Sequence, residues 1–495
     1  MEAAVIVPPL SSIIETSSSL SSEHDGNQPR AESMRDTENR HGWRFVFDGF
    51  RYVILALGVL CLTAIGCNYT IINFTFICMT EDKEDLVEHG NGTMRQRYDY
   101  TPTEKGFIIW AVALGTILGT FPINWAYVRW GARYPFFISG LLSAFSTALS
   151  PAAAHTSLWL FVALRFLQGL AYAADFAAIG IIVVRWAPLG QTAIFIAFLT
   201  CFSPIAAIIT NPLAGFFCTT IGWRWAFYVH SIATVVVFCL WALLYKDDPE
   251  LHKAVSAAEL KTIQDGKTKE HIHRDSFVPY WDICKNKTIL VVWFNAVTEL
   301  IGYIIMLTYA PTYINKVLGF TVAQTAFWAT LGSMLHFPLK LFCGVLSDKI
   351  TCIREKYKMY IFNTIAVGVA GILCGMIGLM PSPLTAAVAL TASTTIMGVN
   401  TGGFYKQYGH FVLATIQFSK CVALVIGPLM VAVFASSDTD AHGWVIIFIL
   451  NAVLMLIANF LFYFTATDQP AEFTKITRQS VQDMKIGMEK GMALE

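Results

Sequence analysis

The chain has 495 residues, of which 55% are hydrophobic and only 14% are charged. A water-soluble protein has about 25% charged residues, because its surface must be solvated, so this composition excludes an ordinary soluble domain. The formal net charge is zero, which gives no sign of a nucleic-acid partner.

The first 45 residues are rich in Ser, Glu and Arg. Their one apolar stretch, residues 5–10, is short and broken by Pro8 and Pro9, so it does not have the pattern of a cleaved signal peptide. We predict a disordered cytosolic tail over residues 1–45. The Ser cluster at residues 17–22 fits a linker better than a phosphorylation site.

Six apolar stretches in the first half have the length of a membrane span, which is about 20 residues. They lie between Arg51 and Glu81, between Lys105 and Arg129, between Arg133 and Arg165 with an exit turn at Pro151–His155, from Trp159 to Arg185, between Gln191 and Ile221, and between Arg224 and Lys246.

A charged stretch of mixed sign from Lys246 to Lys287 follows and cannot cross a membrane. Beyond it, residues 359–405 contain no Asp, Glu, Lys or Arg, and the Pro381-Ser-Pro383 break divides this run into two helices. The other four predicted helices of the second half cover residues 289–309, 321–344, 410–434 and 443–464.

This pattern predicts an all-α membrane protein with twelve transmembrane helices in a 6+6 arrangement. We expect a cytosolic tail at 1–45, an N-terminal six-helix bundle at 46–245, a cytosolic central loop at 246–288, a C-terminal six-helix bundle at 289–467, and a cytosolic tail at 468–495.

The short loops divide by charge. One side carries Arg129, Arg133, Arg185, Lys349, Arg354, Lys356, Lys358 and Lys406, whereas the loops at 151–156, 381–383 and 436–442 have no Lys or Arg. The positive-inside rule therefore places both termini in the cytosol. The first outer loop contains the sequon Asn91-Gly-Thr93, so we expect Asn91 to be glycosylated. Two further sequons, at Asn68 and Asn73, lie within the first helix and are excluded.

The eleven cysteines are scattered, mostly within apolar runs, and no pair has the spacing of a metal site or a disulfide framework. We interpret them as small buried hydrophobic residues. The chain also lacks a P-loop and a His/Glu metal motif. These absences predict no cofactor, no metal and no enzymatic activity.

Several short motifs follow one another between residues 105 and 430. They are Ala163–Leu170 with Trp186–Pro188, Gly222–Trp223 with Phe227–Val229, Asp248–His252 with Ser256 and Glu259, Pro311–Tyr313 with Val317–Phe320, and Gly344–Asp348. Together they resemble the major facilitator superfamily, and within it the anion transporter branch of sialin, the vesicular glutamate transporters and the sodium–phosphate cotransporters. Gly and Pro at matching depths in the two halves, as in Asn211–Gly215 and Gly427–Pro428, support this resemblance.

The chain departs from that branch at three places. The branch's Arg in the first helix is Ile71 here, its proton-coupling Glu in the fourth helix is Tyr172, and its acid after the second helix is Val128. The resemblance therefore does not carry over a substrate or a coupling ion. It does imply that Asp348 helps to latch a cytosolic gate, with Arg129, Gly131 and Arg133 as the equivalent residues of the first half.

Two cations lie deep within predicted helices, where charge is costly unless it is paired or hydrated. Arg165 matches the Arg of the branch's fourth helix, and its planar fork suits a carboxylate or phosphate. The alternative is a structural ion pair with a neighbouring helix. Lys420 is too deep in the eleventh helix to reach the interface, so it should pair with an acid or contact an anionic substrate.

Two acids are the candidates for coupling or gating. A carboxyl group removed from water favours its neutral form, which suits a proton carrier, and Asp175 could have this role; alternatively, Asp175 anchors a loop cation such as Arg185. Glu299, in the middle of the seventh helix, could hold a cation, pair with Arg165 in one conformation, or bind a proton.

The remaining candidates are polar groups. His336 and Lys340 lie four residues apart on one face of the eighth helix. His336 is a titrating group or a satisfied core histidine, and Lys340 is better explained as reaching the cytosolic interface. Polar crevice-lining residues are predicted at Tyr69 and Asn73, together with Asn68 and Tyr303.

These observations predict a monomeric secondary transporter that moves a small organic anion by alternating access, coupled to H⁺ or Na⁺. Two alternatives stay open: the same fold carrying a neutral or cationic solute, and a non-transporting receptor. The cellular membrane, plasma or lysosomal/vesicular, is not resolved by these residues.

Overall fold

The computed structural model describes residues 49–80, 86–89, 93–96, 98, 100–265, 267, 285–350, 352–402 and 409–467. The described chain is helical apart from one antiparallel hairpin, in which β1 (Leu86–His89) pairs with β2 (Thr93–Gln96). The sequence analysis did not predict this hairpin. The two predicted tails and Asn91 lie outside the described residues.

The described residues of the first half form eight long or medium helices and one short one. These are α2 (Phe50–Met79), α3 (Pro102–Trp130), α4 (Arg133–Thr156), α5 (Leu158–Tyr172), α6 (Asp175–Trp186), α7 (Thr192–Thr200), α8 (Phe202–Thr219), α9 (Trp223–Leu244) and α10 (Ala257–Gln264).

The second half contains α-helices with π and 3₁₀ turns between them. The elements are α13 (Lys287–Thr312) with the π turn Tyr313–Val317, α14 (Val322–Lys349), α15 (Glu355–Asn363), the π turn Thr364–Val369, α16 (Ala370–Met376), the 3₁₀ turn Ile377–Leu379, α17 (Pro383–Met397) with the 3₁₀ turn Gly398–Gly402, α18 (Gly409–Phe434) and α19 (Ala441–Thr465).

Within the described residues, ten helical segments are long and apolar enough to cross a bilayer. The tenth and eleventh predicted spans correspond to α17 and α18, where the continuous apolar stretches are shorter. The helical membrane fold is confirmed, whereas the count of twelve spans and the cytosolic position of the termini stay predictions.

The fourth and fifth predicted helices each consist of two segments. The chain turns at Ala173–Ala174 between α5 and α6, and at Cys201 between α7 and α8. Pro204 explains the second break, because it has no N–H for the carbonyl of Thr200 and its ring would crowd that carbonyl in a continuous helix.

The predicted exit turn at Pro151–His155 is wrong. Pro151 lies inside α4, which continues to Thr156 and ends at the extended residue Ser157. A proline removes only one hydrogen bond from a helix, and the small residues that follow it still favour helical backbone. The predicted break at Pro381–Pro383 is confirmed, because Ser382 caps the start of α17.

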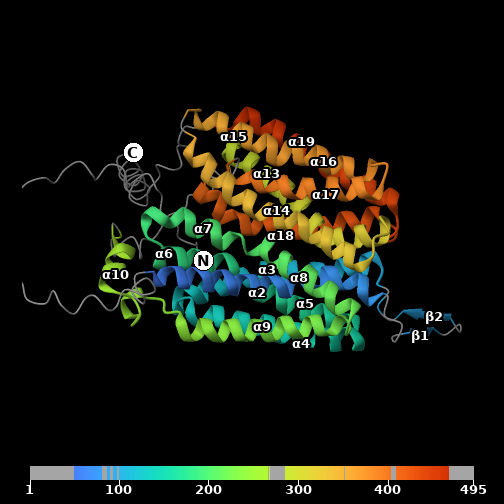
Figure 1. The fold of residues 1–495 in the computed structure, drawn as a ribbon, viewed down its shortest axis with the longest axis horizontal. Coiled ribbons are helices and arrows are strands. Elements are labelled where there is room, and N and C mark those ends of the chain that lie inside the picture. Colours follow the sequence, from blue (N-terminus) through green and yellow to red (C-terminus); the bar gives the residue numbers. More distant parts are fainter. Residues whose placement is uncertain are drawn as a thin grey trace, which may run out of the picture.

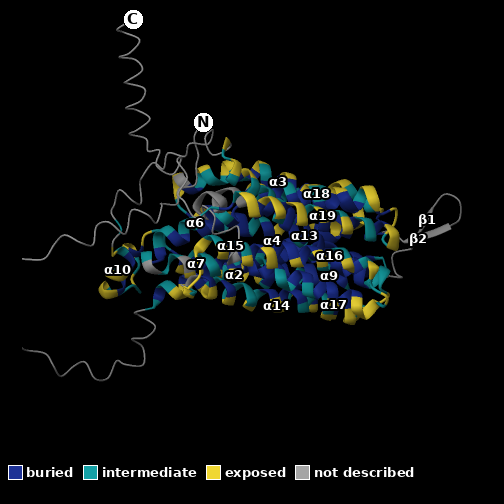
Figure 2. Ribbon diagram, turned by 90° about the horizontal axis from the view of Figure 1, so that it is seen from above, coloured by how far each residue is buried: buried dark blue, intermediate teal, exposed yellow. Residues whose placement is uncertain are grey.

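The helices of the two sequence halves form two neighbouring groups. Figure 1 shows the blue and green helices of the first half on one side and the yellow to red helices of the second half on the other. The helix pairs that pack most extensively across the boundary are α2 with α13, α3 with α18, and α8 with α14. We call this boundary the seam. Figure 2 shows buried residues in the interior and exposed ones on the outer faces and ends.

Two contacts join helix ends at the end of the molecule that carries α10. The amide and guanidinium of Arg51, at the start of α2, both bond to Glu259 of α10. At the start of α13, the Thr288 hydroxyl donates to the carbonyl of Thr465, at the end of α19. Figure 1 places α10 at one end of the bundle and the β1–β2 hairpin at the other. The central-loop helix and the first outer loop therefore lie on opposite faces.

A disulfide joins Cys78 at the end of α2 to Cys218 near the end of α8. The expectation that all cysteines act as small buried hydrophobic residues is therefore wrong for this pair. Their separation of 140 residues gives no recognisable spacing, and only the fold brings the two helix ends together. Eight further cysteines in the described chain are free.

Candidate functional site

The four ionisable residues that the sequence placed deep in the membrane are all buried. The exposed fractions are 0% for Arg165 and Asp175, 2% for Glu299 and 9% for Lys420. Arg165 and Asp175 belong to the first half, whereas Glu299 and Lys420 belong to the second. The fold thus places one cation and one acid in each half.

Arg165 lies on α5 and reaches toward α2 and α3. Its guanidinium donates to the carbonyl of Tyr69 at 3.1 Å, to the carbonyl of Ile108 at 3.5 Å, and to the side-chain oxygen of Gln168. No acid accepts from it in the described chain, so the described contacts do not include the structural ion pair of the alternative. Its Nη2 atom is buried without an acceptor among the described residues.

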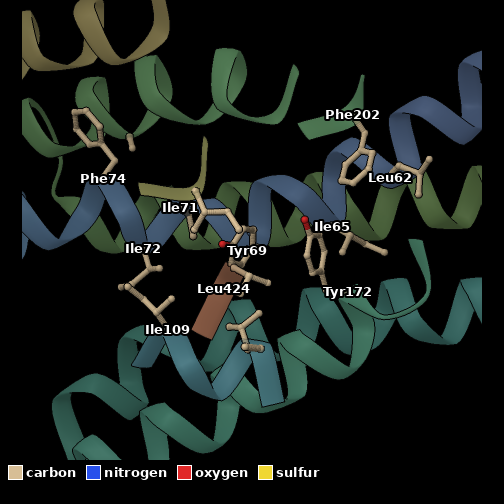
Figure 3. Packing of buried hydrophobic residues seen from close by; sticks show 14 of the residues in the cluster. Leu62, Ile65, Tyr69, Ile71, Ile72, Phe74, Ile109, Tyr172, Phe202 and Leu424 are labelled. Carbon is tan, nitrogen blue, oxygen red and sulfur yellow. The ribbon is translucent and has the colours of Figure 1, made fainter. Parts of the chain in front are cut away.

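The ring of Tyr69 contacts both this arginine and the ring of Tyr172. The guanidinium lies 5.7 Å from the centroid of the Tyr69 ring, and that ring stacks on Tyr172 with a centroid distance of 4.9 Å. Figure 3 shows Tyr69, Tyr172 and Phe202 in one buried cluster, to which α18 contributes Leu424. The site is therefore built on packed aromatic rings at the seam.

Lys420 extends from α18 into the first half. Its ammonium lies 3.5 Å from the centroid of the Tyr172 ring, 5.2 Å from that of Phe176 and 5.7 Å from that of Phe202. We call these three rings the aromatic cage. The Nζ atom has no hydrogen-bond acceptor among the described residues. The rings supply electron density in place of an acceptor.

Asp175 is the first residue of α6, directly after the break in the fourth predicted helix. The positive end of that helix favours negative charge there. Lys420 is the cation that acts on this carboxyl, and both carboxyl oxygens are buried without a donor in the described chain. The alternative that Asp175 anchors Arg185 is wrong, because Arg185 bonds to Asp248 at 2.6 Å.

Glu299 lies on α13 and contacts the end of the tenth predicted helix. The side-chain amide of Asn400 donates to its Oε1 at 2.5 Å, and its Oε2 has no partner among the described residues. Lys340 acts electrostatically on Glu299 and on His336. The Lys340 side chain is half-buried, and it lies near these two candidate residues.

His336 packs as a satisfied core histidine, one of the two predicted alternatives. Its Nδ1 lies 2.9 Å from the carbonyl of Thr394, and its ring lies 5.4 Å from that of Tyr303. Beside Tyr303, a cavity of about 10 Å³ is lined by residues of both halves, including Asn211 and Ser333. That is room for about one water molecule.

The two asparagines of α2 differ. The Asn68 amide donates to Ser143 and to Thr234, both at 3.0 Å, so it ties α2 to α4 and α9 inside the first half. It does not line the seam. Asn73 is buried, and its Nδ2 has no acceptor among the described residues.

The turn between α3 and α4 is held by an acid that the sequence analysis did not select. The Asp247 carboxylate accepts from the backbone amides of Ala132 at 2.6 Å and Arg133 at 3.4 Å. Burial raises the pKa of Asp247, against the effect of those two hydrogen bonds. Gly131 has a φ of +74°, and a Cβ there would meet this carboxylate at 2.5 Å.

The structure describes the surroundings of only some of the predicted gate residues. Arg133 donates from its guanidinium to the carbonyl of Ala242 at 2.6 Å, within the first half. Arg129 is exposed, and the side chain of Asp348 lies outside the described part. The structure brings Gly131 and Arg133 to Asp247, and it leaves a latch that involves Asp348 untested.

The opposite end of the seam is closed by contacts that the sequence did not reveal. Lys105, at the start of α3, forms a salt bridge with Asp438 in the loop between α18 and α19. The Trp110 indole donates to the carbonyl of Val425 at 2.9 Å, which joins α3 to α18. No sequence motif marks either contact. Lys105 and Asp438 lie at a helix end and in a loop, where charged residues are common.

A family model described as the Major Facilitator Superfamily matches residues 58–412, most of the chain. The chain belongs to the Major Facilitator Superfamily. It is a multi-pass membrane transporter, and the expectation that it is not an enzyme is confirmed by this membership.

Curated relatives lie in the anion transporter branch of the superfamily. Human sialin is 24% identical over 82% of this chain and 85% of its own length. Sodium-dependent phosphate transport protein 1 of Mus musculus is 23% identical over 87% of this chain and 97% of its own length. The probable small intestine urate exporter of Mus musculus is 24% identical over 74% of this chain and 76% of its own length.

Solved structures of superfamily members share the fold. A bacterial homologue of the human lysosomal transporter Spinster, in an inward-facing unoccupied conformation, aligns with a TM-score of 0.63 and 14% identity, covering 84% of this chain and 97% of that one. A D-xylose–proton symporter aligns with a TM-score of 0.59 and 15% identity, covering 82% and 97%. At these identities the likeness shows the fold alone.

Proposed function

We propose that this transporter moves a small organic anion across the membrane by alternating access. One observation carries the proposal: Arg165 and Lys420, two buried cations of the seam region, each keep a donor atom without a hydrogen-bond acceptor among the described residues, Nη2 and Nζ respectively. An unsatisfied buried donor is costly, and a charged one more so, so these groups are retained where a ligand completes them.

An anionic ligand is the group that satisfies both donors. Arg165 offers a planar fork to a carboxylate or phosphate, and Lys420 offers a point charge from the opposite half. The names of the relatives point the same way, since they include a urate exporter and a phosphate transport protein. Tyr69 and Asn73 on α2, with Tyr303 on α13, are proposed to line the path beside these cations.

The coupling ion is proposed to be a proton, carried by Asp175 or Glu299. Each has at least one buried carboxyl oxygen without a donor in the described chain. A buried carboxylate without donors is costly to ionise, so a carrier that exposes and buries it in turn also takes up and releases a proton. Sodium coupling is the alternative, and imposed gradients separate the two.

A cationic solute is the rival substrate class, because aromatic rings beside an acid also bind ammonium groups. Here the aromatic cage already holds the ammonium of Lys420. The cage therefore accounts for a charged side chain of the protein itself, which favours the anion proposal.

The proposal includes the organisation of the chain. The chain divides into bundles at 46–245 and 289–467 around the central loop 246–288, works as a monomer, and is glycosylated at Asn91. The cytosolic gate is proposed to involve Arg129, Gly131, Arg133 and Asp348, and His336 is proposed to act deeper in the membrane, in coupling or gating.

The test is uptake into proteoliposomes with imposed pH or Na⁺ gradients. The probes are radiolabelled urate, inorganic phosphate and D-glucarate, with tetraethylammonium as the cationic comparison. We expect saturable uptake of at least one anion and none of the cation. Arg165→Lys keeps the charge but loses the fork, so we expect at least about a tenfold loss of uptake.

The matched control is Arg354→Lys, which makes the same change at an exposed residue. We expect it to transport normally, and size-exclusion chromatography checks that both variants stay folded. Uptake of the cation but of no anion, or full anion uptake by Arg165→Lys, contradicts the proposal.

A further inference from the structure

The contact between Lys420 and the aromatic cage crosses the seam. Lys420 belongs to α18 in the second half, and the three rings belong to α5, α6 and α8 in the first half. All three centroids lie within 5.7 Å of the ammonium. Any movement that separates the halves at this level must therefore withdraw Lys420 from the cage.

Asp175 is the charge that balances Lys420 in this position. It directly precedes Phe176 of the cage at the start of α6, both of its carboxyl oxygens are buried without a donor in the described chain, and its charge acts on Lys420. Without an ionised partner, an ammonium held only by rings in a buried site would keep most of its desolvation cost. The ionisation of Asp175 therefore determines how firmly Lys420 is held.

Lys420 is the described charge that acts on the Asp175 carboxyl. Around Asp175, α7 has no charged residue, and α2 has only Arg51, which bonds to Glu259. The remaining titratable neighbours are the phenols of Tyr127 on α3 and Tyr172 on α5, with Cys421 beside Lys420 on α18. Arg165 is held by backbone carbonyls and Gln168, so it is not a counter-ion for Asp175.

We propose that ionised Asp175 holds Lys420 in the aromatic cage and keeps the halves together, and that a proton on Asp175 releases Lys420 to bind the anionic group of the substrate. The inference rests on the proposed function as an anion transporter. It makes the aromatic cage the resting position of the substrate-binding lysine. One proton then enters with each anion, because the lysine is free for the anion only when Asp175 is neutral.

The first experiment needs no substrate. Cys421 is 2% exposed and adjoins Lys420, whereas Cys374 is fully buried inside the second half. Purified full-length protein in proteoliposomes is treated with N-ethylmaleimide at a single pH, and labelling of each cysteine is followed by mass spectrometry. Asp175→Asn imitates the protonated acid, and Lys420→Met removes the cation at similar volume.

We expect both variants to label Cys421 at least about tenfold faster than the wild type, as expected when a desolvated cation–π contact is lost. Lys420→Arg retains a cation for the rings and should stay protected. Asp265→Asn, at an exposed acid, is the matched control. Cys374 should remain unlabelled in every variant, which shows that the second half is still folded. Equal Cys421 labelling in the wild type, Asp175→Asn and Lys420→Met overturns the inference.

The second experiment measures uptake of urate, inorganic phosphate and D-glucarate against external pH. We expect wild-type uptake to rise by up to about tenfold per pH unit of acidification below saturation, as one bound proton requires. The uptake that Asp175→Asn supports should be independent of pH, and Lys420→Met should lose uptake. Wild-type anion uptake with unchanged pH dependence in Asp175→Asn contradicts the inference alone. Faster Cys421 labelling in the variants, without any anion uptake by the wild type, contradicts the proposed function instead.

Discussion

Asp440 shows how a single side chain secures a helix at the outer end of the molecule. It precedes α19 and accepts from the backbone amide of Gly443 at 3.0 Å, and it also accepts from the amide and hydroxyl of Ser436. These donors lower the pKa of the Asp440 carboxyl to about 2 from its ordinary value of 3.8. The charged form is therefore the one that the fold binds.

We predict that Asp440→Ala lowers the melting temperature at neutral pH, because the first turn of α19 loses its cap. Since the folded-state pKa is depressed, the stabilisation is complete above the ordinary pKa of 3.8 and is lost as the pH falls toward 2. Thermal unfolding of both proteins at several pH values checks this. A melting difference that is as large near pH 2 as at neutral pH contradicts the assignment.

For single residues, the sequence predicted which buried residues are charged, but it did not predict the neutral groups that contact them. Arg165, Asp175, Glu299 and Lys420 stand out because charge is rare in apolar helices. Their partners are backbone carbonyls, an Asn and aromatic rings, which are common in any membrane helix. Tyr172 was recognised only as a departure from the family pattern, and its role in the aromatic cage needed the fold.

Glycines decide how closely α3 and α5 approach. A Cβ on Gly115 would collide with the carbonyl of Phe166, and a Cβ on Gly169 would collide with that of Val112. Both obstacles are backbone, so no side chain can move aside. Gly106 on the same helix α3 is different, because its Cβ would lie 3.6 Å from the Trp110 ring, an ordinary contact.

We predict that Gly115→Ala and Gly169→Ala each destabilise the protein by about 2 kcal/mol or more, because overpacking at backbone contacts forces the helices apart. Gly106→Ala is the control and should be close to neutral. Melting temperature and the yield of monodisperse protein are the measurements. Wild-type stability in Gly115→Ala would show that α3 and α5 are not packed at this distance.

The disulfide between Cys78 and Cys218 fastens two helix ends of the first half. We predict that Cys78→Ser lowers the free energy of unfolding by about 2–4 kcal/mol, because the link closes a long loop in the unfolded chain. Reducing agent should lower the melting temperature of the wild type and leave that of Cys78→Ser unchanged. Cys239→Ser, at an exposed free cysteine, is the control. Insensitivity of the wild type to reduction contradicts the prediction.

The existence and type of the helices could be predicted, since long uncharged runs bounded by charges are an unambiguous signal. Their internal breaks could not. Pro204 breaks a span and Pro151 does not, although both are prolines within apolar runs. Packing around each residue decides the outcome. The disulfide pairing likewise depends on which helix ends meet.

At the scale of the whole molecule, the two halves are held together at the seam by contacts of different kinds, which lie at different depths. Near the hairpin end, Lys105 pairs with Asp438 across the halves, and Gly215 allows α8 to approach Ala326 of α14. Deeper, Lys420 occupies the aromatic cage. The helical membrane fold could be predicted from the sequence, because long apolar runs repeat along the chain. The conformation could not, because it depends on contacts between residues more than 300 positions apart, such as the 333 that separate Lys105 from Asp438.

Under alternating access, the two halves must separate and rejoin at the seam for a solute to cross. Lys105 and Asp438 touch in this conformation, so Lys105→Cys together with Asp438→Cys places two thiols within reach of a short bifunctional methanethiosulfonate. Anion uptake is measured in proteoliposomes before cross-linking, after it, and after reduction, with both single-cysteine variants as controls.

We predict that cross-linking stops uptake in the double variant alone and that reduction restores it. Undiminished uptake by the fully cross-linked protein would contradict alternating access in this molecule.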